Sequence, residues 1–196
     1  QYSSPAFLIS KKDLEASGRL IVDYSGLNSQ IHTQPISLPN LDQIIGQLKG
    51  KTFYSNIDIS NAFNSIELTE DSKKLTLFST CAGNFVFCKL ATGLCSSPEI
   101  LNRFMHKMVH FILVRDEKGQ IIWLPDGTAK LEHSPLAHVY LYYDDILIAT
   151  DWINDYETSK KAHFELVEEV VRRLSTHNAK ISINKCTFYA SSIKFL

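Results

Sequence analysis

The sequence lacks the features that mark several specialised classes of protein. It has no uninterrupted apolar run near the ~20 residues that a membrane span needs, and its first residues do not resemble a signal peptide. No internal repeat, low-complexity tract or long Gly/Ser/Pro linker divides its 196 residues. Since 44% of the residues are hydrophobic and 21% are charged, the composition predicts one globular domain or two small packed ones. The missing membrane span and signal peptide predict a protein inside a cell and away from membranes.

Cysteine is also scarce, and its spacing carries no metal signature. Cys81, Cys88, Cys95 and Cys186 form no Cys-x-x-Cys pair and have no His at zinc-finger spacing, so reduced thiols are expected. An excess of basic charge is missing too, because the net charge is −1. A protein that grips a nucleic-acid backbone usually concentrates Lys and Arg on one face, so overall charge neither supports nor excludes such a partner.

Two adjacent carboxylates are the most informative feature that the sequence does contain. Asp144 and Asp145 stand between the apolar runs at 139–141 and 146–149. Runs rich in β-branched and aromatic residues around a short polar step predict an antiparallel hairpin. Two like charges this close raise each other's pKa unless a cation neutralises them, and hard divalent cations are the usual remedy. The pair therefore predicts a metal-binding hairpin tip.

A third carboxylate ends another predicted strand. Residues 53–59 have the composition of a strand, Asp58 stands at its carboxyl end, and Ser60 and Asn61 mark the turn that follows. If this strand lies beside the hairpin, carboxylates from distant sequence positions converge. They can then hold two Mg²⁺ ions roughly 3.5–4 Å apart for in-line phosphoryl transfer.

The remaining sequence predicts a mixture of helices and strands. Apolar residues at helical spacing, with capping residues before them, predict helices after Asn40, from Ser97 to about Phe111, and over residues 156–177. Residues 116–135 form a polar stretch with a central apolar run and are compatible with an extra hairpin. Further strands are predicted at 6–9, 19–24, 75–79, 84–90, 180–183 and 192–196.

An ordered series of motifs runs along the chain. It consists of the paired segments 4–13 and 19–28, then 35–48, 53–68, 90–98 and 142–145. This series resembles the reverse transcriptase domain of retroviruses and, more closely, of gypsy-type long-terminal-repeat retrotransposons. In that family the segments correspond to the opening fingers strands, a linking helix, the first catalytic motif, a substrate-contacting loop and the Tyr-x-Asp-Asp signature. The resemblance covers nearly the whole chain.

The resemblance implies an α+β fold with the fingers and palm of a polymerase right hand. It places the fingers at about residues 1–50 and 69–90, and the palm, an antiparallel sheet packed on helices, at about 51–68 and 91–196, with the thumb absent. The implied reaction is RNA-directed DNA polymerisation: a primer 3′-hydroxyl attacks a deoxynucleoside triphosphate with two Mg²⁺ ions, or Mn²⁺. The implied partners are an RNA or DNA template with its primer, deoxynucleoside triphosphates, and the thumb, connection and ribonuclease H regions of a polyprotein. The expected location is the cytoplasm or a virus-like particle.

The same resemblance implies catalytic roles. Asp58 and Asp144 match direct metal ligands, and Asp145 matches the third carboxylate. Because side chains alternate along a strand, Asp145 is expected to contribute less directly than Asp144. Lys185 falls in a region where a lysine protonates the departing pyrophosphate, with an ordinary surface lysine as the alternative.

Residues that contact the substrates are implied in the same way, each with a plainer alternative. Basic side chains would neutralise the triphosphate or simply solvate a hairpin. An aromatic ring would exclude a 2′-hydroxyl or belong to the core, and a glycine would let the backbone approach the substrate or merely form a turn. The implied nucleotide-binding residues are Lys12, Arg19, Ala62, Phe63, Thr92 and Gly93, and the implied primer-supporting residues are Tyr142 and Tyr143.

Three departures from the family pattern concern substrate contacts and not the metal ligands. Thr92 stands where Gln or Phe is common, Ser25 where Arg is usual, and Tyr143 where Met, Val, Leu or Ile is frequent. Two rival functions stay open. One is a non-catalytic nucleic-acid-binding relic of a retroelement, against which the three intact aspartates argue. The other is an RNA-directed RNA polymerase, against which Phe63 argues.

Overall fold

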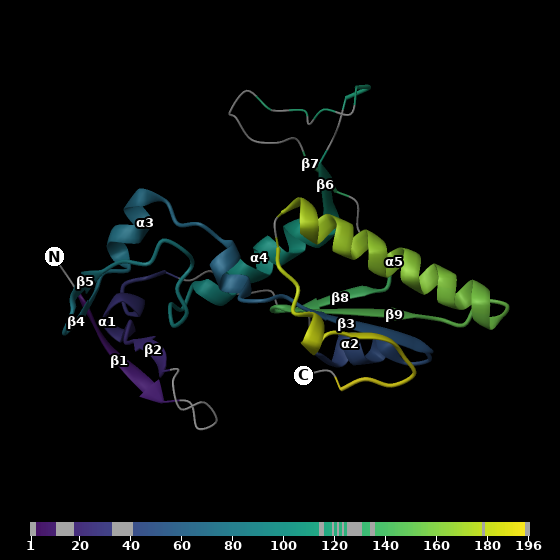
Figure 1. Cartoon of the computed structure of the whole chain (residues 1–196), viewed down its shortest axis with the longest axis horizontal. Helices are drawn as coiled ribbons and strands as arrows, with labels where there is room; N and C mark the ends of the chain where they lie inside the picture. Colours follow the sequence, from purple (N-terminus) through teal and green to yellow (C-terminus); the bar gives the residue numbers. More distant parts are fainter. Residues whose placement is uncertain are drawn as a thin grey trace. The chain divides into compact units, whose positions relative to one another are not determined.

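The computed structural model describes residues 3–10, 18–32, 41–113, 116–118, 120, 122, 124, 131–133, 136–177 and 179–194. The chain divides into two compact units, whose elements are labelled in Figure 1. The first comprises residues 1–36 and 61–101, and the second comprises residues 37–60 and 102–196. The fingers and palm boundaries inferred from the sequence stay a prediction.

A four-stranded sheet in the order β2-β1-β4-β5 forms the base of the first unit. Its strands are β1 (Ser4–Ser10), β2 (Gly18–Val22), β4 (Phe78–Thr80) and β5 (Gly83–Phe85). β1 pairs antiparallel with β2, and β4 does so with β5, whereas β1 and β4 run parallel. The two strands predicted at 6–9 and 19–24 are therefore confirmed.

Short helical segments complete the first unit. They are α1 (Ser25–Asn28), the 3₁₀ turn η1 (Ala62–Ser65) and α3 (Glu70–Leu75). The Thr69 hydroxyl accepts a hydrogen bond from the Ser72 amide and so caps α3. The core of the unit consists of the buried side chains of Val22, Tyr24, Phe78, Ala91 and Leu94.

The second unit contains a fully antiparallel sheet in the order β10-β3-β9-β8. Its strands are β3 (Phe53–Asp58), β8 (Val139–Tyr142), β9 (Asp145–Thr150) and β10 (Thr187–Ala190). β8 and β9 form the predicted hairpin, and β3 lies beside β9 along its whole length. Both the predicted hairpin and the predicted convergence of the two carboxylate-bearing strands are confirmed.

Helices cover both faces of this sheet (Figure 1). They are α5 (Tyr156–Thr176) and α2 (Leu41–Leu48). Neighbouring residues of a strand point to opposite faces. The Ser55 hydroxyl bonds to His163 of α5, whereas the Tyr54 hydroxyl donates to the backbone of α2. One face therefore packs on α5 and the other on α2.

Part of a third helix and three short elements complete the second unit; the helix begins in the first unit and belongs to the second from Asn102 onward. α4 (Ser97–His110) begins where the sequence predicts, and the 3₁₀ turn η2 (Ile183–Lys185) precedes β10. β6 (Phe111–Leu113) and β7 (Leu131–His133) pair antiparallel, which confirms a hairpin around the polar stretch. Two of the four residues of its central apolar run, 121 and 123, lie outside the described residues. Asn40, predicted to precede a helix, also lies outside them. No helix of the described part is long and apolar enough to cross a membrane.

Several strand predictions are wrong. The segment predicted at 75–79 begins at the end of α3, whose ion pairs Lys73–Glu70 and Lys74–Asp71 favour a helix. The one predicted at 84–90 stops after Phe85, and the one at 180–183 is reduced to a single bridge at Ile181 before η2. Residues 192–194 form no strand. β10 was not predicted from the sequence, because it pairs with β3 through an irregular register between Thr187 and Ala190 that breaks the alternation by which strands are recognised.

A buried polar network ties the sheet to α5. His163 is fully buried, with Nε2 2.7 Å from Ser55 Oγ and Nδ1 2.8 Å from Thr150 Oγ1. The Tyr189 amide donates to the same Ser55 oxygen. The network therefore joins β3, β9, β10 and α5. Burial lowers the pKa of His163, because the charged imidazolium would lose its hydration.

We expect His163→Leu to lower the free energy of unfolding near neutral pH by about 1–3 kcal/mol, because Ser55 and Thr150 lose their partner. The pKa of His163 is lower in the folded than in the unfolded protein, where it is about 6.5. The stability contributed by neutral His163 is therefore present above about pH 6.5 and is lost as the pH falls toward the folded-state pKa.

Denaturant unfolding at about pH 7.5 and about pH 5 measures both effects. The wild type should lose more stability than His163→Leu between the two pH values. Burial also lowers the pKa of His110 and His177. Both histidines are present in the wild type and in His163→Leu, so their contributions to the pH dependence cancel in the comparison. Equal losses would contradict a buried neutral His163.

Candidate active site

The carboxylates gather at one end of the antiparallel sheet. Asp58, the last residue of β3, pairs directly with Asp145, the first residue of β9. Residues directly opposite each other in an antiparallel pair share a face of the sheet, and so do residues two apart in one strand. Asn56, Asp58 and Asp145 therefore lie on the same face, together with Tyr142, which pairs with Asp145 from β8.

Asp144 lies in the turn that joins β8 to β9. Tyr143 before it adopts a left-handed conformation (φ 54°), and Asp144 itself is exposed. The rings of Tyr142 and Tyr143 meet edge to face with centroids 5.0 Å apart. The strand register puts Asp145 directly opposite Asp58, and the expectation that Asp145 contributes less directly than Asp144 stays a prediction.

Electrostatics distinguish Asp145 within this group. Burial raises the pKa of Asp145, and the neighbouring carboxylates of Asp144 and Asp58 raise it further. A hydrogen bond from Asn56 and the charge of Lys185 act in the opposite direction without cancelling the rise. The crowding of like charges that the sequence suggested is thus present at Asp145.

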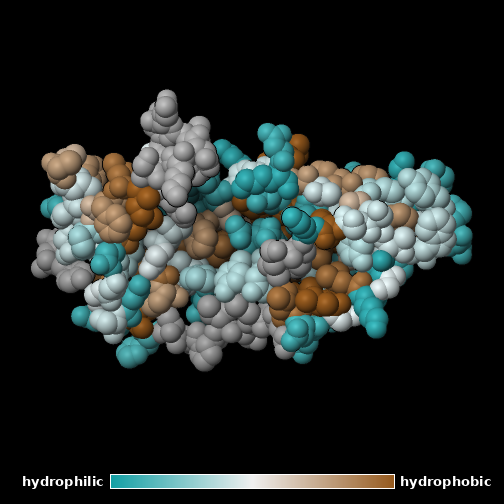
Figure 2. All heavy atoms as spheres, turned by 90° about the horizontal axis from the view of Figure 1, so that it is seen from below, coloured by the Kyte–Doolittle hydropathy of each residue, from teal (hydrophilic) through white to brown (hydrophobic). Residues whose placement is uncertain are grey.

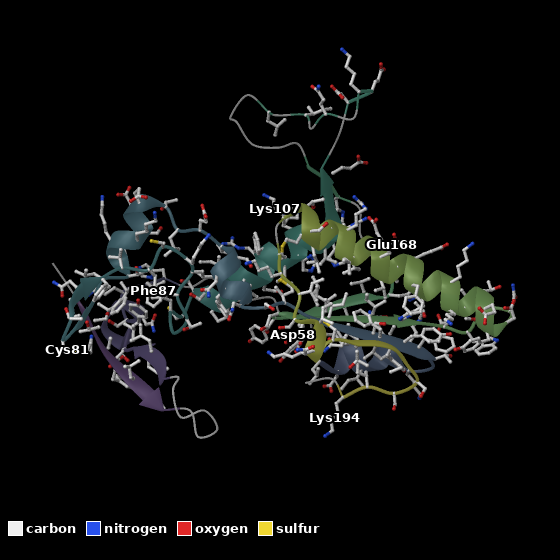
Figure 3. All side chains as sticks on the ribbon, viewed as in Figure 1. Asp58, Cys81, Phe87, Lys107, Glu168 and Lys194 are labelled. Carbon is white, nitrogen blue, oxygen red and sulfur yellow. The ribbon has the colours of Figure 1, made fainter. Side chains whose placement is uncertain are left out.

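The segment around η2 closes over the end of β3 (Figure 3). Lys185 Nζ lies 3.5 Å from Asp58 Oδ1, although the lysine side chain is 69% exposed. The Ser182 amide donates to the Asp58 carbonyl over 2.9 Å, and the Asp58 amide donates to Cys186 Sγ over 3.5 Å. Sequence reasoning selected Lys185 but missed Cys186 and Ser182, because the loop that returns them to β3 follows from folding and not from any motif.

The oxygen atoms of this site suit a hard divalent cation. Asp58 Oδ1 and Asn56 Oδ1 are buried and accept no hydrogen bond from the described residues, although Lys185 Nζ lies 3.5 Å from Asp58 Oδ1. Carboxylate and amide oxygens are the ligands that Mg²⁺ prefers. In the described part of the chain, however, no three His, Cys, Asp or Glu side chains stand close enough together to form a complete metal site. The chemistry of these oxygen donors is therefore of the kind that a divalent cation accepts.

The residues predicted to contact the nucleotide lie in the first unit. Ala62 is buried and Phe63 half-buried in η1, while Thr92 and Gly93 are exposed in a turn. Gly93 has φ +94°, and a Cβ there would meet the Val22 carbonyl at an ordinary 3.6 Å. The left-handed dihedral therefore requires glycine at this position, independently of any close approach by substrate.

Two basic candidates are less fully described. Lys12 lies outside the described residues. Arg19 lies in β2, where its backbone pairs with Ile9.

A separate apolar groove lies in the second unit, away from the predicted site residues. It has a volume of about 380 Å³ and lies between α2 and the chain after β10. Hydrophobic side chains gather on this side of the molecule in Figure 2. The residues that line the groove are Leu41, Ile45, Leu48, Tyr54, Ser191, Ser192 and Ile193.

Comparison with protein families gives a match over residues 9–196 to the family described as "Reverse transcriptase (RNA-dependent DNA polymerase)". Among curated proteins, the chain is 28% identical over its whole length to the Retrovirus-related Pol polyprotein from transposon 297 of Drosophila melanogaster. It is 24% identical over its whole length to that from transposon gypsy of the same organism. The chain spans 16% of the length of each of these relatives.

Among solved structures, the foamy viral protease-reverse transcriptase in complex with an RNA/DNA hybrid has the same fold. The TM-score is 0.73 at 21% identity, over 99% of this chain and 22% of the other. The native prototype foamy virus protease-reverse transcriptase gives a TM-score of 0.74 at 19% identity, over 99% of this chain and 22% of the other. These matches confirm the predicted α+β fold of fingers and palm.

We expect Asp145→Asn to raise the melting temperature of the metal-free protein by a few degrees near neutral pH. A raised carboxyl pKa means that ionised Asp145 destabilises the folded state, so stability is lost as pH rises through that pKa. Thermal unfolding in the presence of a chelator measures the change. Glu168→Gln, which removes an exposed carboxylate from α5, serves as the control and should change little. A lower melting temperature for Asp145→Asn would contradict the predicted repulsion.

Proposed function

The chain belongs to the reverse transcriptase family, and from this premise we propose that it catalyses template-directed transfer of deoxynucleotides to a primer 3′-hydroxyl. The observation that carries the proposal is the pairing of Asp58 with Asp145 at the end of β3 and β9, next to Asp144 in the turn. Such a cluster of carboxylates costs folding stability, as the raised pKa of Asp145 indicates. Its presence is understandable where divalent cations neutralise it.

Asp58, Asp144 and Asp145 would hold two Mg²⁺ ions, with Mn²⁺ as a substitute. When bound, such ions lower the pKa of an attacking hydroxyl and neutralise the charge of a leaving pyrophosphate. The buried Asp58 Oδ1 accepts no hydrogen bond in the described structure, and its contact with the Lys185 ammonium is long at 3.5 Å, so this oxygen can still serve as a ligand. We assign proton donation to the departing pyrophosphate to Lys185, a role that its position 3.5 Å from Asp58 Oδ1 supports.

We assign the substrate contacts residue by residue, each within its own unit. We assign the incoming triphosphate to Lys12 and Arg19, whose positive charges suit phosphate oxygens. We assign the sugar and base to the two turns that carry Ala62 with Phe63 and Thr92 with Gly93. Tyr142 and Tyr143, which flank the carboxylates and pack on each other, would support the primer end.

The partners follow from the relatives. The curated relatives are Pol polyproteins, and one solved structure of the fold holds an RNA/DNA hybrid. We propose that this chain likewise acts on an RNA or DNA template with a paired primer. We propose further that it works with thumb, connection and ribonuclease H regions of a polyprotein, in the cytoplasm or in a virus-like particle.

Primer extension on an RNA template tests the proposal with the full-length protein. Asp144→Asn and Asp58→Asn should each reduce the rate by about a thousandfold or more, because each removes a metal ligand. The conservative change keeps the size of the side chain and removes only its charge.

Glu168→Gln, which alters a carboxylate outside the site, should extend primers like the wild type. Equal extension by the wild type and Asp144→Asn would refute the metal assignment. A wild type without activity in Mg²⁺ and Mn²⁺, but with retained nucleic-acid binding, would favour a non-catalytic relic.

Phe63→Ala tests the selection of deoxynucleotides. Loss of the ring removes the clash with a 2′-hydroxyl, so ribonucleotide incorporation relative to deoxynucleotide incorporation should rise about 10–100-fold. Competition between the two nucleotide types in the same extension assay measures the ratio. Phe85→Ala, at an exposed phenylalanine of β5, is the control. A wild type that prefers ribonucleotides would instead favour an RNA-directed RNA polymerase.

A further inference from the structure

The turn that carries Thr92 and Gly93 is held by side chains that reach it from elsewhere in the first unit. At its C-terminal end, the Ser97 hydroxyl donates to the Ala91 carbonyl over 2.6 Å, and the Ser97 amide donates to the Leu94 carbonyl over 3.1 Å. These bonds anchor both flanks of the turn to the start of α4. Neither bond involves Thr92 or Gly93.

Asn28 restrains the turn itself from α1. Its Nδ2 donates to the Gly93 carbonyl over 2.9 Å, and its Oδ1 accepts from the Cys95 amide over 2.9 Å. Both partners are backbone groups, one able only to accept and the other only to donate. The orientation of the amide is therefore determined by its partners, and only an amide side chain satisfies both bonds at this length.

The short helix α1, which ends at Asn28, is held by hydrogen bonds and by packing against the core. The backbone amide of Asn28 donates to the Tyr24 carbonyl over 2.7 Å. The side chain of Tyr24 is fully buried, and its hydroxyl donates to the Thr76 carbonyl over 3.0 Å. Leu27 packs against the core of the unit. Asn28 thus connects the core of the unit to the turn, in which Gly93 adopts a left-handed conformation.

We infer that Asn28 is a positioning residue: it fixes the backbone of residues 92–95 and thereby sets the affinity for the incoming deoxynucleoside triphosphate. The inference rests on the proposed function, because it assumes that this turn contacts the nucleotide. Asn28 itself need not touch the substrate. Ser25 and Asp23, which bond to each other nearby, do not reach the turn through any hydrogen bond of the described structure.

Amide hydrogen exchange tests the restraint without any assay of activity. Asn28→Ala removes both bonds, and Asn28→Asp keeps the acceptor for Cys95 but turns a carboxylate toward the Gly93 carbonyl. Exchange at the Cys95 amide should accelerate about tenfold in Asn28→Ala and less in Asn28→Asp. Ser29→Ala is the matched control, since its hydroxyl bonds only locally to the Gly26 carbonyl of the same helix. Unchanged exchange at Cys95 in Asn28→Ala would overturn the restraint.

Steady-state primer extension by the full-length protein tests the consequence. Both Asn28 variants should raise the KM for deoxynucleoside triphosphate about tenfold, with kcat and the affinity for primer-template changed far less. Ser29→Ala should leave all three unchanged. A fall in kcat with KM unaltered, or equal effects of Ser29→Ala, would overturn the positioning role while the proposed function stands. A wild type that extends no primer would overturn the proposed function, and this inference with it.

Discussion

The pairing of β3 with β9 is the constraint on which the candidate site depends. It brings Asp58 opposite Asp145 at the strand ends, where burial and like charge raise the pKa of Asp145. Favourable contacts elsewhere along β3 and β9 must offset this repulsion between carboxylates. Ile57 and Ile146, the next opposed pair, are completely buried, and the His163 network closes the face that packs on α5. A hydrophobic sheet thus holds a cluster of like charges in place, as the proposed cation site requires.

In the first unit, packing and hydrogen bonds hold an exposed turn in one conformation. Gly93 permits the left-handed dihedral, Ser97 anchors the flanks, and Asn28 bonds to two backbone groups of the turn. Each bond is modest by itself, but together they leave the turn few alternatives. Pre-organisation of this kind lowers the entropy lost when a ligand binds. In each unit, a packed core therefore restrains a small polar group of residues: the carboxylates in the second unit and the turn that carries Gly93 in the first.

Patterns of residues predicted the elements that have regular alternation or clear caps. The hairpin of β8 and β9, the strand β3 and the long helix α5 follow this rule. Prediction failed where local sequence and tertiary context disagree. α3 is short and held by a cap and side-chain ion pairs, and β10 pairs with β3 through an irregular register. The contact of Lys185 with Asp58 depends on β10 and η2, so no spacing in the sequence could reveal it.

The sequence by itself determined which chemical groups are available: three aspartates near strand ends, two tyrosines, and an ordered series of motifs whose family the comparisons confirm. It could do so because apolar alternation and motif order are local properties of a chain. Only the tertiary structure decided which carboxylate faces which. Strand register is set by pairing between distant segments, and it placed Asp145 opposite Asp58 while leaving Asp144 exposed in the turn. The same holds for Asn28, whose role became visible only when the fold brought it to Gly93.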